Sequence, residues 1–511
     1  MNELMLKDIY IGYVDGQKEA SSQEHNFADL FYTKNSKYEQ IIKEHNFIIS
    51  GRKGTGKTIL AKYMENEKEK EDELIKIKYI NLPNEIKQHE FTERNFTDIK
   101  EDEYNLFPKY YILKTATELI LENKVGLFKY LMNSNGNLLK RIKKYYHYAK
   151  SFRNLKKIHS ERYPKGNFFS DNIHSEVGNS QMSQIKVEYK EASAQREYNQ
   201  HESRKRDFRF KNYSALIDEI ENDVKRCVKV SPILLIFDDV DDIKNYMDNM
   251  VKVKKFLIGL IKSINEINKS LLIENHKNKC IMIIRDDILD SLNSLDSNLN
   301  KIVADAAVNL DWIGNNQTDM LIDMICNKIK KSNKKFDNVT TENVLKLFIK
   351  DRSYKAIIDY IINRGFGRPR DIILYLNIIV RNNQYAKNIS FSLVKNALNE
   401  YSNQFWNEIK NELSFFYSEK QIDEIEKLLG FIGKNVLKYD DIKEYINTHK
   451  DDYTEIGNLK KLLSDLYKYG MIGNKRYKKT ASYYYRKDGR NYFCYDEAVM
   501  VHRGLLKVLN L

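Results

Sequence analysis

The stretch that most constrains the fold of this chain is GRKGTGKT, residues 51–58, which follows the short apolar run NFII. It matches the pattern G-x-x-x-x-G-K-[ST] in full. In that pattern the glycines let backbone N–H groups curl around a β-phosphate. The lysine reaches the β- and γ-phosphates, and the hydroxyl ligates Mg²⁺. The residues expected to hold a nucleotide are therefore Gly51, Gly54, Thr55, Gly56, Lys57 and Thr58, with Thr58 also a metal ligand.

The flanking sequence supplies the context that such a loop requires. We expect a strand at residues 47–50 and a helix that runs from the loop to about residue 67. The N-terminal end of that helix would add its positive dipole to the phosphate site. The alternative is a glycine-rich turn between a strand and a helix that holds no ligand.

A second motif, ILLIFDDVDD, supplies carboxylates at the end of an apolar run. Asp238 at the carboxyl end of a strand would hold Mg²⁺ directly or through water. Asp239 occupies the position at which many such ATPases carry a glutamate that polarises the attacking water. Aspartate is one methylene shorter, so hydrolysis is expected to be slow or to need a partner. Asp241 and Asp242 fit a helix start better than extra metal ligands; the alternative for the whole motif is a buried strand with a solvated acidic end.

Two further segments carry arginines that could reach a triphosphate. In IMIIRDD, Arg285 ends a buried strand. If that strand lies between the loop strand and the acidic strand, Arg285 is aimed near the γ-phosphate; the alternative is a surface arginine paired with Asp286 or Asp287. In NRGFGRPRDIILYLN, Arg368 and Arg370 lie at a helix start with a proline in its first turn. Either could reach back to the phosphates, and the alternative is an ordinary basic helix start.

The order of elements along 511 residues predicts several domains. After a lead-in, residues 1–45, strands alternate with helices over 46–311, which is typical of a parallel sheet covered by helices. Residues 312–412 are expected to be all-helical and to form a lid. Residues 413–511 indicate three amphipathic helices and a strand pair with an Asp488-Gly489 turn, the elements of a winged helix.

The net charge of +13 is concentrated in one place. Residues 140–213 hold 18 Lys or Arg against 8 Asp or Glu, and they read as an insertion within the core. This insertion is either a solvated segment or a surface for phosphates or nucleic acid. Basic residues also alternate with tyrosines in NKRYKKTASYYYRKDGRNYF. That mixture suits nucleic-acid contact, and the alternative is a wing whose tyrosines pack on the helices.

Composition excludes several other classes of protein. No apolar run approaches 18 residues, so no transmembrane helix is expected, and the N-terminal stretch does not resemble a signal peptide. The four cysteines are far apart, which argues against a disulfide framework or a zinc site and favours a reducing cytoplasm.

Together the motifs GRKGTGKT, LLIFDDVDD, IIRDDI, LDW, GRPRDIILYLN and VHRGLLKVL resemble the FunZ-like bacterial P-loop ATPases. Those proteins are similar in turn to the AAA+ and STAND NTPases. The resemblance implies an α/β P-loop NTPase core with a helical lid and a winged helix. It implies that residues 51–58 are Walker A and that Asp238 and Asp239 are Walker B. It also implies that Arg285 is a sensor-strand arginine and that Arg370, or Arg368, is a sensor 2 arginine.

By that resemblance the chain is expected to be an ATPase switch that binds ATP and Mg²⁺, in antiphage defence or nucleic-acid transactions. Two alternatives stay open. In one, the protein binds nucleic acid through the insertion and the wing, and its ATP or ADP is structural. In the other, it is a scaffold that recruits a separate effector protein. A homo-oligomer and a cytoplasmic location without membrane attachment are expected, and the basic insertion departs from the family pattern.

Overall fold

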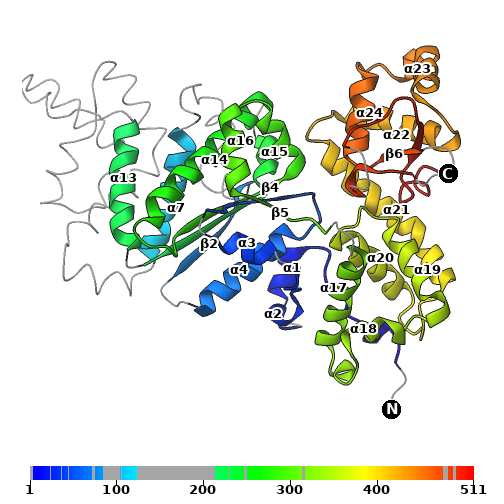
Figure 1. Ribbon diagram of the computed structural model, residues 1–511, viewed down its shortest axis with the longest axis horizontal. Helices are drawn as coiled ribbons and strands as arrows, with labels where there is room; N and C mark the ends of the chain where they lie inside the picture. Colours follow the sequence, from blue (N-terminus) through cyan, green and yellow to red (C-terminus); the bar gives the residue numbers. More distant parts are fainter. Residues whose placement is uncertain are drawn as a thin grey trace, which may run out of the picture. The chain divides into compact units, whose positions relative to one another are not determined.

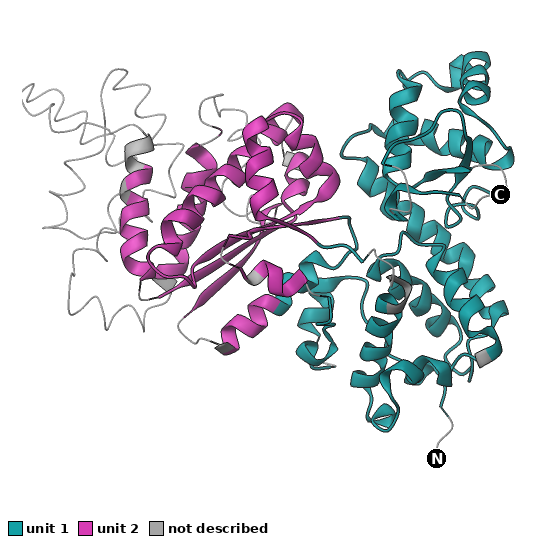
Figure 2. Ribbon diagram, viewed as in Figure 1, with its two compact units in different colours: residues 1–36, 52–63, 310–511 teal, residues 37–51, 64–309 magenta. Residues whose placement is uncertain are grey.

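The computed structural model describes residues 4–22, 25–35, 37–43, 45–71, 75–83, 104, 106–122, 213–229, 231–246, 250–312, 317–475, 481–486 and 491–511. These residues form two compact units (Figure 2). One unit, here called the sheet unit, comprises residues 37–51 and 64–309. The other, here called the helical unit, comprises residues 1–36, 52–63 and 310–511.

The sheet unit contains a five-stranded parallel sheet, as the sequence predicts (Figure 1). Its strands are β1 (Ile48–Gly51), β2 (Lys76–Asn81), β3 (Ile233–Asp238), β4 (Lys279–Arg285) and β5 (Ala307–Asn309). Their order across the sheet is β2-β3-β4-β1-β5. β4 therefore lies between the loop strand and the acidic strand, the arrangement on which the expectation for Arg285 depends. The edge strand β5 was not expected, because it has only three residues.

Buried aliphatic side chains explain why the strands lie at the centre of this unit. Every residue of β1, β3 and β4 is buried. The helices α7 (Leu106–Glu122) and α14 (Met250–Leu272) pack on the sheet and on each other, while α13 (Tyr213–Val228) packs on α7 (Figure 1). Asn268 of α14 exchanges two hydrogen bonds with the backbone of Cys280 on β4, at 2.7 and 2.8 Å. These bonds satisfy a buried amide and fix the helix against the strand.

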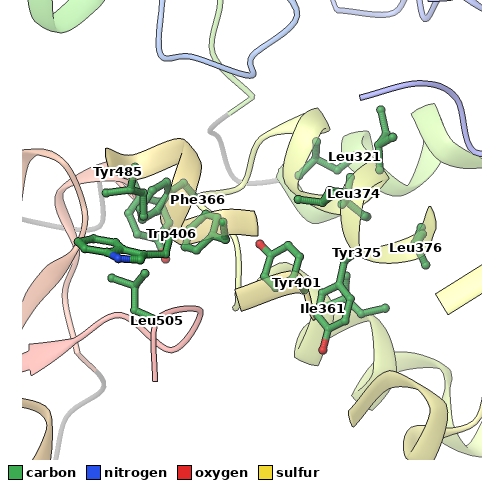
Figure 3. Close-up of a cluster of buried hydrophobic side chains, with 14 of the residues drawn as sticks. Leu321, Ile361, Phe366, Leu374, Tyr375, Leu376, Tyr401, Trp406, Tyr485 and Leu505 are labelled. Atoms are coloured by element: carbon green, nitrogen blue, oxygen red, sulfur yellow. The ribbon is translucent and has the colours of Figure 1, made fainter. Parts of the chain in front are cut away.

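The helical unit contains the long helices that the sequence predicts after residue 312. They are α17 (Gln317–Ser332), α19 (Asp351–Ile362), α20 (Pro369–Asn382), α21 (Phe391–Leu413), α22 (Glu419–Lys434), α23 (Tyr439–Thr448) and α24 (Leu459–Lys468). One hydrophobic core joins residues on both sides of the expected boundary at residue 412. In Figure 3, Tyr375 and Tyr401 lie face to face, with ring centroids 4.4 Å apart. Phe366, Trp406, Tyr485 and Leu505 gather beside them.

Most of the lead-in, residues 1–36, belongs to the helical unit, whereas residues 37–45 belong to the sheet unit. Leu6, Ile9 and Ile11 are buried among the helices after residue 312. Glu19, in α1 (Gly16–Ser21), forms an ion pair with Lys328 of α17, and both side chains are almost fully buried. The N-terminal residues are therefore fixed by packing and by a buried charge pair.

The C-terminal strand pair differs from the prediction. β6 (Ile472–Lys475) pairs antiparallel with β7 (Ala498–Val501), which lies later in the chain than the expected second strand. Residues 484–486 instead form a short 3-10 helix with Tyr485 buried. Tyr483 and Tyr485 thus pack inward, as the alternative for this segment supposed. The expected Asp488-Gly489 turn lies outside the described residues.

Two further expectations concern charge and membranes. The basic insertion, 140–213, lies outside the described residues apart from its last residue, Tyr213, which begins α13. Within the described ranges, no helix is both long enough and apolar enough to cross a membrane. The four cysteines are not joined in disulfides.

Candidate nucleotide-binding site

The GRKGTGKT stretch forms a loop between β1 and α4 (Lys57–Glu71), as expected. The helix begins at Lys57 itself, so the backbone N–H groups of its first turn lie at the loop. Gly54 and Gly56 have φ angles of 83° and 95°. Residues that carry a Cβ rarely adopt a positive φ, which explains why glycine stands at both positions.

Three consecutive carbonyl groups of the loop are bound by donors from far along the chain. The Arg368 Nη1 atom donates to the Lys53 carbonyl at 2.7 Å. The Arg370 backbone N–H donates to the Gly54 carbonyl at 3.3 Å. The Trp312 indole Nε1 donates to the Thr55 carbonyl at 2.8 Å. All of these residues belong to the helical unit.

These bonds also orient the loop's N–H groups. A trans peptide is planar, so a carbonyl fixed in one direction sets the following N–H in the opposite direction. The Lys53 carbonyl accepts from Arg368 and the Thr55 carbonyl from Trp312, so the N–H groups of Gly54 and Gly56 each point away from that donor, while the Thr55 N–H donates to the Arg52 carbonyl at 3.4 Å. Successive N–H groups turned to one side form an anion-binding concavity.

Lys57 and Thr55 both donate to the carbonyl of Arg52. The Lys57 ammonium is 2.8 Å from that oxygen, and the Thr55 hydroxyl is 2.9 Å from it. The lysine is therefore folded over its own loop, where its charge adds to that of the N–H groups.

The acidic motif lies at the carboxyl end of β3 in the sheet unit. Asp238 is 2% exposed. Its Oδ2 accepts the Tyr79 hydroxyl, and its Oδ1 accepts the Asp239 backbone N–H at 2.8 Å. The next carboxylate, Asp239, has a φ angle of 54° and accepts a hydrogen bond from the Asn81 amide at 2.6 Å. β2 thus contributes two polar side chains that fix both carboxylates.

Arg285 ends β4 directly opposite Gly51, the last residue of β1. Its guanidinium forms a bidentate pair with Asp287 and lies 3.8 Å from the Asp241 carboxylate. The pairing with Asp287 agrees with the alternative, but Arg285 is 6% exposed and is therefore not a surface residue. Asp241 and Asp242 lie in a 3-10 helix, Val240–Tyr246, as expected of a helix start.

Arg368 and Arg370 differ sharply in their surroundings. Arg368, 2% exposed, donates to Asp371, to Glu412 at 2.7 Å and to the Lys53 carbonyl. Burial alone would lower the pKa of Arg368, but the carboxylates of Asp371 and Glu412 outweigh it and raise that pKa well above its ordinary value. Arg370 is more exposed, and its Nη1 lies 3.6 Å from Glu408, a carboxyl whose pKa burial raises.

The oxygen donors present suit Mg²⁺ better than a softer metal. Mg²⁺ usually binds one or two carboxylates together with waters and phosphate oxygens. In the described part of the chain, no group of three or more His, Cys, Asp or Glu side chains could hold a metal by itself. Within the sheet unit, Asp238 is the carboxylate that the sequence assigned to the ion, and it lies at the carboxyl end of β3.

Comparison with protein families supports part of this description. Residues 319–410 match the FunZ-associated C-terminal helical domain. The match begins in α17 and reaches nearly to the end of α21, and it includes Arg368, Arg370 and Glu408. It supports the FunZ-like resemblance over these residues. The search of curated proteins found no match.

Several contacts at the site escaped sequence reasoning. Tyr79 and Asn81 lie on a strand whose alternating pattern predicted only its conformation. Trp312 was part of a motif, LDW, without an assigned contact. Glu412 carried no signal, because its partner Arg368 is 44 residues away in the sequence. Arg52, a variable position of the pattern that the sequence assigned no role, binds the Tyr469 carbonyl at 2.7 Å.

Proposed function

We propose that this chain binds Mg-ATP and hydrolyses it as a conformational switch. The observation that carries the proposal is the loop between β1 and α4. Its Lys53, Gly54 and Thr55 carbonyls are each bound by a donor from residues 312–370, so that the N–H groups of Gly54 and Gly56 point away from the donors of the Lys53 and Thr55 carbonyls. A loop that only connected a strand to a helix would not need three separate donors to hold its peptides. An anion with several oxygens is the ligand that such a loop fits best.

In this proposal Lys57 and the loop amides bind the β- and γ-phosphates, and Thr58 and Asp238 hold Mg²⁺. The ion would neutralise charge on the phosphate oxygens. Asp239 would orient the attacking water, with Asn81 fixing its carboxylate at 2.6 Å. The strand register supports a role for Arg285 near the γ-phosphate, because Arg285 pairs with Gly51 at the end of β1.

One observation favours slow turnover over rapid hydrolysis. Asp239 is shorter than glutamate, and the Asn81 amide already occupies one of its oxygens. A carboxylate held in this way is a weaker base for water than a free one. We therefore expect nucleotide to remain bound for long periods, as suits a switch.

ATP turnover and nucleotide affinity of purified variants test the proposal. Lys57→Ala should lower turnover by about 100-fold or more, because it removes a cation that stabilises the phosphates. Lys53→Ala is the matched control, since it removes a neighbouring positive charge but keeps the backbone carbonyl that Arg368 binds. Asp239→Asn should bind nucleotide and fail to hydrolyse it. Unchanged turnover in Lys57→Ala would overturn the proposal.

A further inference from the structure

Arg52, the first variable residue of the GRKGTGKT loop, makes its contacts among the C-terminal helices. Its Nη2 donates to the Tyr469 carbonyl at 2.7 Å and lies 3.6 Å from the Glu412 carboxylate. Its guanidinium carbon also lies 4.4 Å from the centre of the Phe366 ring. The phosphate-binding pattern itself does not require an arginine at this position.

The Tyr469 carbonyl is an end group of α24. Gly470, with φ of 78°, and Met471 close this helix in a Schellman motif. The Met471 N–H donates to the Leu466 carbonyl at 3.0 Å, and the Gly470 N–H donates to the Tyr467 carbonyl at 2.9 Å. Arg52 donates to the carbonyl of Tyr469, the residue that caps the C-terminal end of this helix. A cation at this end also complements the helix dipole.

The same arginine is joined to Arg368 through one carboxylate. The Glu412 side chain is 5% exposed. Its carboxylate lies 3.6 Å from Arg52 and accepts a hydrogen bond from Arg368 at 2.7 Å. Arg368 in turn binds the Lys53 carbonyl, next to Arg52 in the chain. Glu412 of α21 thus joins Arg52 of the loop to Arg368 at the start of α20. Arg52 joins the loop to the Tyr469 carbonyl at the end of α24.

We propose that Arg52 is the relay through which nucleotide at the loop changes the stability of the end of α24. This inference rests on the proposed function. Lys57 donates to the carbonyl of Arg52, so the same residue is held by the phosphate-binding lysine at its backbone and by α24 at its side chain. A phosphate that draws the Lys57 ammonium toward itself loosens the Arg52 peptide. The cap on α24 weakens as a result.

Thermodynamic linkage makes the relay reciprocal. If nucleotide weakens the contact between Arg52 and Tyr469, then removing that contact must favour nucleotide binding by the same factor. A role for Arg52 limited to folding predicts the opposite, since a damaged loop would bind nucleotide more weakly. The direction of the affinity change therefore separates the two roles.

The test combines nucleotide affinity with hydrogen exchange at the Gly470 and Met471 amides, using Mg-ADP and Mg-ATPγS as probes. In the unaltered protein, nucleotide should speed this exchange by about fivefold or more. Arg52→Met should exchange quickly without nucleotide, respond no further, and bind nucleotide more tightly by a similar factor. Arg52→Lys keeps the charge, loses the geometry of the guanidinium and should behave in the same way. Lys53→Ala should respond as the unaltered protein does.

The outcomes are distinguishable. If Arg52→Met and Arg52→Lys respond to nucleotide as the unaltered protein does, or bind it more weakly, the relay is wrong while the nucleotide site stands. If the unaltered protein binds nucleotide without any change at Gly470 and Met471, the relay is likewise wrong. If the unaltered protein binds no nucleotide, the proposed function and the relay both fail.

Discussion

Replacing Arg368 with methionine should unfold the helical unit at a much lower temperature than replacing Arg370. Arg368 is buried between Asp371 and Glu412, whose side chains are each 5% exposed. Methionine fills similar space but removes the guanidinium that both carboxylates contact, although Glu412 keeps Arg52 at 3.6 Å. Breaking a buried ion pair in this way costs about 3–5 kcal/mol. For a unit of about 150–250 residues, each kcal/mol lowers the melting temperature by about 2–4 °C, so the expected drop is about 6–20 °C.

Arg370→Met provides the matched comparison. The Arg370 side chain is 23% exposed, and its nearest carboxylate oxygen, on Glu408, is 3.6 Å away. Its loss should cost about 1 kcal/mol or less. Tryptophan fluorescence is the appropriate measurement, because the chain has two tryptophans and both Trp312 and Trp406 belong to the helical unit. An interval of 2 °C corresponds to about 1 kcal/mol. If the melting temperatures of Arg368→Met and Arg370→Met differ by less than this interval, the reasoning is refuted.

Three further perturbations test other parts of the structure. The pKa of His502 is held well below its ordinary value by burial and then by nearby arginines. The unfolded chain takes up a proton at His502 more readily than the folded one, so the free energy of unfolding falls as the pH drops below about 6.5, by up to about 1.4 kcal/mol per pH unit. His502→Asn should flatten this pH dependence in melting curves. Gly54→Ala should lower stability by about 1–3 kcal/mol and weaken nucleotide binding, because φ is 83° and the new Cβ would lie 3.0 Å from the Arg370 Cβ. Lys328→Met should cost about 3–5 kcal/mol by leaving Glu19 buried and uncompensated, and should speed proteolysis of the N-terminal residues.

Gly54→Ala and Lys328→Met each have a control within the same unit. Gly430→Ala lies in α22 where an added Cβ meets nothing within 4 Å, so it should be neutral or stabilising. Lys335→Met removes the partner of Asp8, but its side chain is 46% exposed, so the loss should be small. A pH slope in His502→Asn equal to that of the unaltered protein would contradict the assignment of that slope to His502.

The sequence predicts the parallel sheet well, because its strands are short apolar runs and its helices have clear periodicity. β3 and β4 begin and end within a residue or two of ILLIFD and KCIMIIR. The motif positions also locate the loop and the Asp238 carboxylate. β5 escaped prediction because three residues carry no detectable pattern.

Contacts between distant residues could not be predicted, because one sequence does not show which side chains meet. Nothing in LDW indicates that Trp312 donates to the Thr55 carbonyl. The C-terminal hairpin was placed too early because Asp488-Gly489 is a strong turn signal, whereas β6 pairs with a strand that begins only at Ala498. The tyrosines that come before Asp488, Tyr483 and Tyr485, are buried, which the turn signal alone does not indicate.

The bonds to Lys53, Gly54 and Thr55 also govern when the loop can take its shape during synthesis. The ribosome makes residues 51–58 and the whole parallel sheet before it reaches Trp312, Arg368 and Arg370. A nascent chain stopped after β5 would carry the complete GRKGTGKT motif without the donors that orient its amides. Under the proposed function, nucleotide would bind only after Trp312, Arg368 and Arg370 have been made, so that an unfinished chain would not be loaded.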